Sequence, residues 1–358
     1  MANATSASYL PPPPTCNLTP RPSLIPGVSD HVLGTVLPTL VYIIASGFFY
    51  WLSEQGSLSQ YRIHPSEEEL KRNHVSRSQC LRVVVRYHVM QVATGLLLSY
   101  GEGPELTGSH SCDVYRWAVR VRHAQKAVPW AFALVGIDAK GLALTTYSKN
   151  AVLVQLLAGN SKAISESNPA QAMGFTASEL LLAEFIVSYA GQAAQFLVAL
   201  SVVDTWIYFT HRLCHVNKTL YRVVHAQHHQ LYVSYAYGAV YGHWLESIFL
   251  DILSFVMANA IAGLSARQSM VFGSLATIKT ISDHCGYVFP LDPFRYVNNN
   301  GARFHDLHHQ TWGLKNNFST YTVFWDNLLG TTWTDKAGAA ARYSRVHEQT
   351  KRRAEKAL

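Results

Sequence analysis

The chain has 358 residues, of which 49% are hydrophobic and only 14% charged, well below the share of charge that is typical of soluble domains. With 8 Trp, 19 Tyr and 15 Phe, this composition favours a membrane protein over a pair of soluble domains. The net charge of +7 suits an anionic membrane face, and the absence of a Lys/Arg stripe beside a reading motif argues against a nucleic-acid partner.

The N-terminal half predicts a polar tail followed by hydrophobic segments. Residues 1–30 are rich in Pro, Ser, Thr and Asn and predict a flexible tail without a cleavable signal peptide. Residues 32–52 carry no charge and are long enough to cross a bilayer, which makes them the clearest transmembrane segment. Residues 81–100 are apolar but interrupted by basic side chains, and residues 130–159 predict a membrane hairpin or two interfacial helices.

The second half predicts more helices. Residues 160–178 are expected to form a loop, residues 180–209 a long apolar helix, and residues 245–281 a helical hairpin that turns near 263–267. The sequence thus predicts an all-α integral membrane protein with about four transmembrane helices and a cytosolic, histidine-rich helical cap. We expect a tail (1–30), a membrane-embedded domain (31–335, with its histidine-rich core at 200–330) and a basic C-terminal tail (336–358).

Charge and cysteine placement predict orientation and redox state. Loops rich in Lys and Arg usually stay on the cytosolic side of a membrane. We therefore expect three basic segments in the cytosol: 62–82, 116–126 and the C-terminus. The N-terminal tail, with glycosylation sequons at Asn3 and Asn17, would then be luminal. The five cysteines are odd in number and scattered, so we expect no disulfide framework but reduced packing residues: Cys16, Cys80, Cys112, Cys214 and Cys285.

Histidine placement is the strongest signal in the sequence. Nine of the seventeen histidines form an H-x3-H pair, two H-x-x-H-H segments and one outlier, and imidazole is a common ligand of transition metals. Residues three or four apart share a helix face, and their divergence would let one segment bridge two ions. Nine nitrogens are too many for one ion and about right for two. The candidate ligands are His211, His215, His225, His228, His229, His284, His305, His308 and His309.

Three nearby carboxylates are expected to hold ligand imidazoles through their second ring nitrogen: Asp204, Asp283 and Asp306. Asp204 lies seven residues before His211 on the same helical stripe. The alternative for Asp204 is a helix-end carboxylate paired with Arg212 or Lys218. No catalytic residue beyond the ligands is identified.

The ligand chemistry favours iron. The sequence has no H-E-x-x-H motif of zinc hydrolases and no Glu within the clusters, unlike soluble di-iron bundles. An all-histidine site at a membrane surface suits iron that activates dioxygen on a lipid. An ordinary packing role stays open for His284 and is favoured for His243.

Two other functions remain open. One is a hydroxylase or desaturase that acts on another long-chain lipid, a sterol or a secondary metabolite. The other is a membrane metal carrier, which should place charged or histidine side chains inside crossing helices. The predicted ligands instead lie beyond the ends of apolar segments, which favours the enzyme.

The clusters and the residues around them resemble the fatty acid hydroxylase superfamily, and most closely the fungal sphinganine C4-hydroxylases. The similarity covers roughly residues 21–333, and at one point Thr320-Tyr321-Thr322 replaces a common Gln-Pro-Phe. The matching segments are 23–26, 29–30, 61–67, 204–212, 217–221, 225–229, 235–238, 277–280, 283–287, 298–299, 305–310, 317–319 and 325–326.

The resemblance implies a non-haem di-iron site with the nine histidines as ligands. It implies O2-dependent hydroxylation at C4 of sphinganine or dihydroceramide, giving phytosphingosine or phytoceramide. Electrons would come from NAD(P)H through cytochrome b5 and its reductase, as separate membrane proteins. The implied location is the endoplasmic reticulum membrane, with the histidine clusters facing the cytosol.

Overall fold

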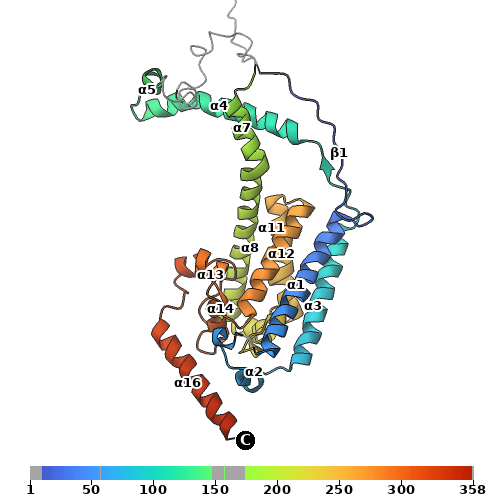
Figure 1. The fold of residues 1–358 in the computed structure, drawn as a ribbon, viewed down its shortest axis with the longest axis vertical. Helices are drawn as coiled ribbons and strands as arrows, with labels where there is room; N and C mark the ends of the chain where they lie inside the picture. Colours follow the sequence, from blue (N-terminus) through green and yellow to red (C-terminus); the bar gives the residue numbers. More distant parts are fainter. Residues whose placement is uncertain (1–9, 57, 147–156, 158–173, 357–358) are drawn as a thin grey trace, which may run out of the picture. The chain divides into compact units, whose positions relative to one another are not determined.

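The computed structural model describes residues 10–56, 58–146, 157 and 174–356, and it is predominantly helical (Figure 1). The chain divides into two compact units. The first comprises Met1–Pro22 with Pro104–Ala194, and the second comprises Ser23–Gly103 with Gln195–Leu358.

Four helical segments of the described chain are long and apolar enough to cross a membrane, which confirms the prediction of an all-α membrane protein with about four spans. They are Asp30–Glu54 (α1), Arg77–Ser99 (α3), Ala177–Val216 (α7 Ala177–Phe185, η4 Ile186–Ala190 and α8 Gly191–Val216) and Trp244–Ala262 (α10 Trp244–Glu246, η8 Ser247–Ile252 and α11 Leu253–Ala262).

The described part of the segment 130–159 contains no candidate span, which leaves the alternative of two interfacial helices open. It contains the end of α4 (His110–Leu134) and α5 (Ala139–Thr146), and neither helix is among the four candidate spans. Residues 147–156 and most of the loop expected at 160–178 lie outside the described residues.

The first unit contains α4, α5, α7, η4 and a small antiparallel sheet of β1 (Thr19–Pro20) and β2 (Leu106–Thr107). α4 packs against α7. Between these two helices, the buried guanidinium of Arg122 donates to both carboxylate oxygens of Glu179, at 2.9 and 2.7 Å. This bidentate pair satisfies two charges that would be costly to bury alone.

A disulfide joins Cys16 to Cys112, so the N-terminal segment is tied to α4. The hydroxyl of Tyr115 also donates to the carbonyl oxygen of Pro11 at 2.7 Å. The prediction of no disulfide is therefore wrong for this pair, and residues 10–22 are more ordered than the predicted flexible tail. The bond escaped prediction because its partners lie 96 residues apart, a spacing that matches no motif. The other cysteines are free and buried, as expected: Cys80, Cys214 and Cys285.

In the second unit, α1 packs against both α3 and α12 (Ala266–His284) (Figure 1). Small residues allow this close approach, because a side chain at Gly95 of α3 would collide with Thr35 of α1. The outer faces are apolar and open: Ile44 is 73% exposed and Leu97 is 74% exposed. Such faces are typical of helices that contact lipid.

The hairpin predicted at 245–281 is present. α11 ends at Gly263, whose left-handed conformation (φ 62°) closes the helix, and a capping box at Ser265 starts α12. The basic segment predicted as a C-terminal tail forms α16, which packs against α2. The remaining elements are η1 (Ser59–Tyr61), α2 (Ser66–Arg72), α9 (Lys218–Leu220), η5 (Tyr221–His225), η6 (His228–Gln230), η7 (Ala236–Gly238), α13 (Pro293–Asn298), α14 (Ala302–His309), α15 (Phe324–Leu328) and α16 (Lys336–Glu355).

Candidate metal centre

All nine predicted ligands come together within the second unit. α8 carries the H-x3-H pair near its C-terminal end, α12 ends at the outlier His284, and α14 carries one H-x-x-H-H segment. The other segment lies between η5 and η6. Eight of the nine side chains are buried and His215 is half-buried. Histidines far apart in the sequence therefore share one enclosed region.

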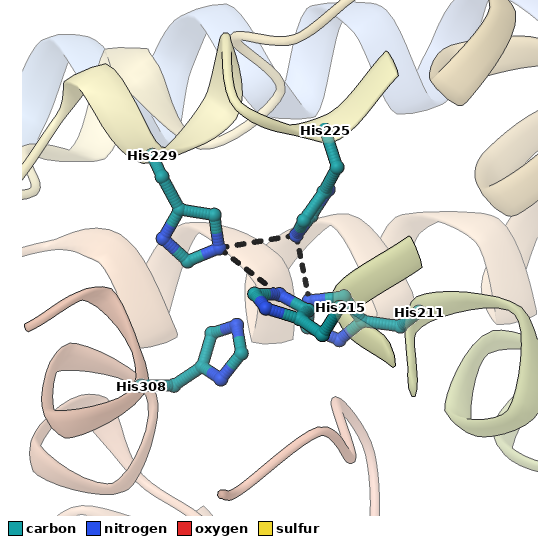
Figure 2. Close-up of side chains that lie close together, drawn as sticks. All are labelled: His211, His215, His225, His229 and His308. Atoms are coloured by element: carbon teal, nitrogen blue, oxygen red, sulfur yellow. Dashed lines mark hydrogen bonds between the residues drawn. The ribbon is translucent and has the colours of Figure 1, made fainter. Parts of the chain in front are cut away.

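The nine rings form two adjacent groups in which the potential ligand atoms lie within 4.8 Å of one another. Figure 2 shows the first group, in which rings from α8, from the segment 225–229 and from α14 point toward one centre. We call it cluster A: His211, His215, His225, His229 and His308. We call the second group cluster B: His228, His284, His305 and His309.

Each H-x-x-H-H segment contributes to both clusters, but in opposite ways. In the first segment, His225 and His229 belong to cluster A and His228 to cluster B. In the second, His305 and His309 belong to cluster B and His308 to cluster A. The second segment is regular α-helix, whereas the first passes from the π-helical η5 to the 3-10 η6 instead of forming the regular helical turn expected.

Neighbouring ring nitrogens lie at separations that suit a shared metal ion. Nε2 of His225 is 3.0 Å from Nε2 of His211 and 3.1 Å from Nε2 of His229. In cluster B, Nε2 of His305 is 2.9 Å from Nε2 of His284. Two nitrogens bound at right angles to one ion, each at about 2.1 Å, would be about 3.0 Å apart. The rings are thus spaced like adjacent ligands of a metal.

Backbone carbonyls fix the direction of the lone pairs. Nδ1 of His211 donates to the carbonyl oxygen of Phe318, and Nδ1 of His284 donates to that of Thr280, both at 2.8 Å. A carbonyl only accepts, so Nδ1 holds the proton of the neutral ring and Nε2 presents a lone pair to the cluster. Nδ1 of His308 likewise donates to a carbonyl at 2.7 Å, and its buried Nε2 has no hydrogen-bond partner in the described chain.

One carboxylate in contact with a ligand ring was not predicted. Nδ1 of His225 lies 2.8 Å from Oε1 of Glu246, and both side chains are buried. Nε2 of His225 therefore also turns a lone pair toward Nε2 of His211. Two lone pairs facing each other at 3.0 Å repel unless a cation lies between them. The site consequently fits bound metal ions. The sequence signal for Glu246 was an acid near the start of a largely apolar segment, which is costly without a partner.

The three carboxylates expected to contact ligand rings contact other groups instead. Asp204 accepts from the N–H groups of Tyr321 and Thr322, at 3.2 and 2.9 Å, and from the hydroxyl of Thr322 at 2.5 Å. Asp204 thus contacts neither of its predicted partners, which were the His211 ring and a nearby basic residue. Asp283 accepts from Lys279, at 2.5 and 2.6 Å.

Asp306 contacts His64 and Tyr343, so it too binds neighbouring segments and not a ligand ring. These contacts have a common reason. Backbone carbonyls already accept from the Nδ1 atoms of several ligands, which leaves the carboxylates to hold the segments around them.

His243 and the nearby cysteines lie outside both clusters. Nδ1 of His243 accepts from the N–H of Leu245 at 3.3 Å, which caps α10 and agrees with its expected non-ligand role. Sγ of Cys285 donates to the carbonyl oxygen of Tyr287 at 3.5 Å. The donor set of both clusters is therefore imidazole alone.

The ligand rings outside the spans are neutral at physiological pH. Burial lowers the pKa of His225 to about 3. Burial, followed by repulsion from neighbouring rings, lowers the pKa of four others well below the usual value: His229, His305, His308 and His309. A neutral imidazole is the form that binds metal, so protons do not compete for these nitrogens near pH 7.

Comparison with known proteins agrees with this geometry. The fatty acid hydroxylase family model matches residues 196–331, which contain all nine histidines. The chain is 35% identical to the sphingolipid C4-hydroxylase of Saccharomyces cerevisiae, over 89% of this chain and 77% of the relative. It is 36% identical to the corresponding protein of Schizosaccharomyces pombe, over 84% of this chain and 88% of that relative.

A plant relative is similar to the same extent. Sphinganine C4-monooxygenase 1 of Arabidopsis thaliana is 35% identical over 85% of this chain and 88% of its own length. No solved structure matches the chain. The similarity to curated relatives extends well beyond the histidine segments and includes the N-terminal half. The chain therefore belongs to the fatty acid hydroxylase family.

Proposed function

We propose that this chain hydroxylates C4 of a sphingoid lipid, either sphinganine or dihydroceramide, and so gives phytosphingosine or phytoceramide. The C4–H compound, O2, two electrons and two protons become the C4 alcohol and one water. The observation that carries this proposal is the 35% identity, over 89% of the chain, to a relative named for C4 hydroxylation of sphingolipids. Two further relatives with related names support it.

Iron is the metal that best fits this reaction. Imidazole suits iron, copper, nickel and zinc, but zinc has no redox chemistry and could not take part in an oxidation by O2. Nine histidines in two adjacent clusters match two ions. Two iron ions bound there would supply the redox chemistry that activates O2.

The protein's own contribution is to position the ligands and exclude water. His308 and His309 are both 0% exposed, so the centre is closed off from bulk solvent. Exclusion of water limits the loss of reactive species in side reactions. The carbonyls that accept from Nδ1 and the carboxylate of Glu246 hold five of the nine rings in the tautomer that leaves Nε2 free for metal: His211, His225, His228, His284 and His308.

Electrons would come from NAD(P)H through cytochrome b5 and its reductase. Each turnover needs two electrons from outside the substrate. A donor in the same membrane could reach a centre that lies near the ends of α8, α12 and α14.

For the topology, we infer an endoplasmic reticulum protein with a luminal N-terminus and cytosolic histidine clusters. The disulfide between Cys16 and Cys112 supports a luminal position for the two segments that it joins, because such bonds persist in oxidising compartments. The basic stretch at 116–126 lies on α4, the helix that carries Cys112, and would therefore also be luminal, contrary to the expectation from charge alone. Asn17 is exposed and available for glycosylation, whereas Asn317, which begins a further sequon (Asn317-Phe-Ser319), is buried and donates to the carbonyl oxygen of Phe304.

The direct test of function is sphingoid-base analysis of a host that lacks its own C4-hydroxylase. Expression of the chain should restore 4-hydroxylated long-chain bases, and the His308→Ala variant, produced at the same level, should not. An unchanged profile with a well-inserted, iron-loaded protein would contradict the proposed substrate. Metal analysis of the purified protein should find about two irons per chain, and zinc or no metal would contradict the proposed chemistry.

A further inference from the structure

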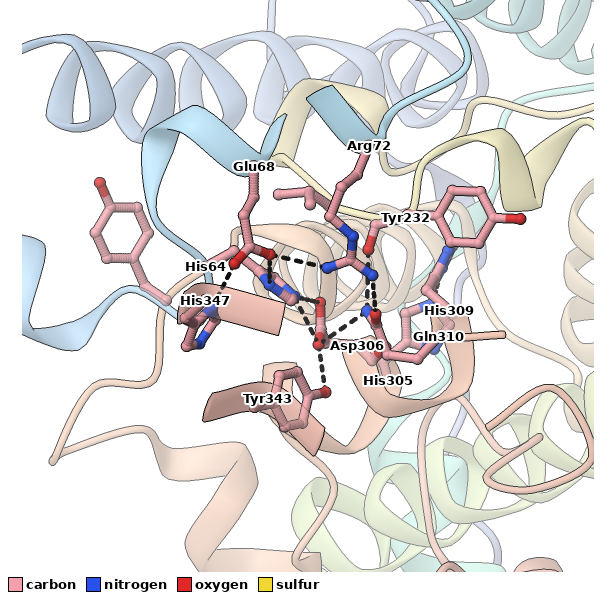
Figure 3. A network of polar contacts seen from close by, with 12 residues as sticks. His64, Glu68, Arg72, Tyr232, His305, Asp306, His309, Gln310, Tyr343 and His347 are labelled. Carbon is pink, nitrogen blue, oxygen red and sulfur yellow. Dashed lines mark hydrogen bonds and ion pairs between the residues drawn. The ribbon is translucent and has the colours of Figure 1, made fainter. Parts of the chain in front are cut away.

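A buried polar network outside the two clusters surrounds Asp306, which lies between ligands on α14 (Figure 3). Its carboxylate is 2% exposed and faces the segment 63–72 and helix α16. Nε2 of His64 lies 2.9 Å from Oδ1 of Asp306, and the hydroxyl of Tyr343 donates to Oδ2 at 2.5 Å. Three parts of the chain that are distant in sequence therefore meet at one carboxylate next to a ligand.

The network continues through a second carboxylate, Glu68 of α2. Nδ1 of His64 lies 2.9 Å from Oε2 of Glu68, so this imidazole bridges two buried acids. His347 of α16 also bonds to Glu68. Nη1 of Arg72 donates to Oε2 of Glu68 at 2.8 Å. The contact between His347 and Glu68 attaches α16 to α2, one helical turn beyond the contact of Tyr343 with α14.

His64 is expected to be protonated, because both of its ring nitrogens face carboxylates. Burial by itself would lower the pKa of His64, but the charge of Asp306 and the hydrogen bonds to Asp306 and Glu68 outweigh it and raise the pKa to about 9. The ring is therefore an imidazolium that donates from both nitrogens at neutral pH.

His64, Glu68 and His347 are close enough to hold a metal ion, but their chemistry favours hydrogen bonding. Both nitrogens of His64 already face carboxylates, and a ring that donates from both has no lone pair left for a metal. The guanidinium of Arg72 also supplies the positive charge that an ion would bring. The cluster therefore joins segments and is not a third metal centre.

α14 is the element that this network controls. The helix has only 8 residues, and it carries ligands for both clusters: His305 and His309 for cluster B and His308 for cluster A. Gln310, directly after α14, connects it to α2, because its side-chain oxygen accepts from Nη2 of Arg72 at 2.6 Å. So short a helix has little rigidity of its own, and its orientation depends on the side chains that hold it.

We propose that His64 and Tyr343 are positioning residues for the metal centre, which act through Asp306 by fixing the orientation of α14. Helix α16 thereby forms part of the support of the centre, although it supplies no ligand. The inference rests on the proposed metal centre. It goes beyond that centre by assigning a positioning role to one residue before the histidine segments and one residue after them. Partners that orient metal ligands typically affect metal affinity by 10- to 100-fold.

Metal affinity of the full-length protein is the decisive measurement. The purified chain in detergent would be stripped with a chelator and titrated with Co²⁺, whose visible absorption reports binding. Tyr343→Phe removes one hydroxyl and keeps the ring. We expect it to weaken Co²⁺ binding about 10-fold at a temperature where the variant is fully folded. The matched control is Tyr42→Phe, since Tyr42 is also buried and its hydroxyl donates to the carbonyl of Tyr237 at 2.9 Å.

A double-mutant cycle separates positioning from general support of the fold. If Tyr343 acts through Asp306, then Tyr343→Phe should have no further effect in an Asp306→Asn background. His64→Gln, which donates to only one carboxylate, should weaken binding to a similar extent. Normal Co²⁺ affinity in Tyr343→Phe, or multiplied losses in the double variant, would overturn the positioning role while leaving the metal centre intact. A wild-type chain that binds no Co²⁺ would overturn the metal centre itself and with it this inference.

Discussion

The carboxylate of Glu246 lies 2.8 Å from Nδ1 of His225, and it is the one acidic side chain of the described residues that contacts a ligand ring of either cluster. Glu246 stands at the start of the apolar segment Trp244–Ala262. A carboxylate in such a segment is costly unless a partner compensates for the lost water. Its contact with His225 provides that partner and at the same time orients the ring.

We expect Glu246→Ala to reduce hydroxylation and bound iron by 10- to 100-fold, because His225 loses the acceptor that fixes its tautomer. Glu246→Gln should be milder, since its amide oxygen can still accept. Sphingoid-base analysis and iron determination on the same preparations would measure both effects. Glu184→Ala serves as the control, because Glu184 also faces a histidine, His110 at 3.1 Å, but belongs to the first unit, which contains none of the nine candidate ligands. Wild-type iron content in Glu246→Ala would refute the assigned role.

His228→Ala and His308→Ala should each abolish hydroxylation, although the two residues belong to different clusters. Each substitution removes one nitrogen from a buried site that offers no replacement. His243→Ala should retain most activity, since the loss of a helix cap costs about 1 kcal/mol of stability. Hydroxylated product and iron per chain are the readouts, with membrane insertion checked in parallel. Turnover in either cluster variant would contradict the two-metal assignment.

The network around His64 predicts a loss of stability at alkaline pH. Its pKa is raised from 6.5 to about 9 in the folded protein, so its contribution is fully present below pH 6.5 and is lost as the pH rises through 9. The charged and titratable groups that face or neighbour this ring are Glu68 and Arg72 on α2, Asp306 on α14, and Tyr343 and His347 on α16.

Melting temperatures of the wild type and of His64→Gln would test this prediction between pH 6 and pH 10. The wild type should be the more stable at pH 6, and the difference should shrink through pH 9. A gap between the two proteins that stays constant over this range would show that the imidazolium form of His64 is not what holds the network.

The disulfide between Cys16 and Cys112 predicts a specific pattern of thiol labelling. Under denaturing conditions without reductant, only the three free cysteines should react with a maleimide-coupled polymer. After reduction all five should react. Cys16→Ser should give four modifications without reductant and lower the stability of the first unit, because opening a loop of this length costs roughly 4.7 kcal/mol in the chain-entropy model. Five modifications of the unreduced wild type would contradict the bond.

The clustering of the candidate ligands was predictable because their pattern is local. The H-x-x-H-H spacing places three rings on nearby faces whatever the surrounding fold is. The spans were predictable for the same kind of reason, since a run of uncharged residues such as 32–52 has few other stable environments than a bilayer. Local patterns thus gave the candidate ligands and the membrane architecture.

The support of the centre was not predictable, because it depends on contacts between distant segments. Asp306 lies next to a ligand in the sequence, yet it binds His64, 242 residues away, instead of an imidazole. The partner of Cys16 and the contact between Glu246 and His225 are likewise matters of tertiary packing. Spacing along the chain does not reveal which of several donors a buried carboxylate will meet.

The opposite use of the two H-x-x-H-H segments has a consequence for how the two clusters can move. His228 and His229 are adjacent in the chain but belong to different clusters, and the same is true of His308 and His309. Consecutive Cα atoms across a trans peptide are about 3.8 Å apart, a length fixed by covalent geometry. Because a single peptide unit joins each of these pairs, a shift of either segment would move candidate ligands of both clusters together.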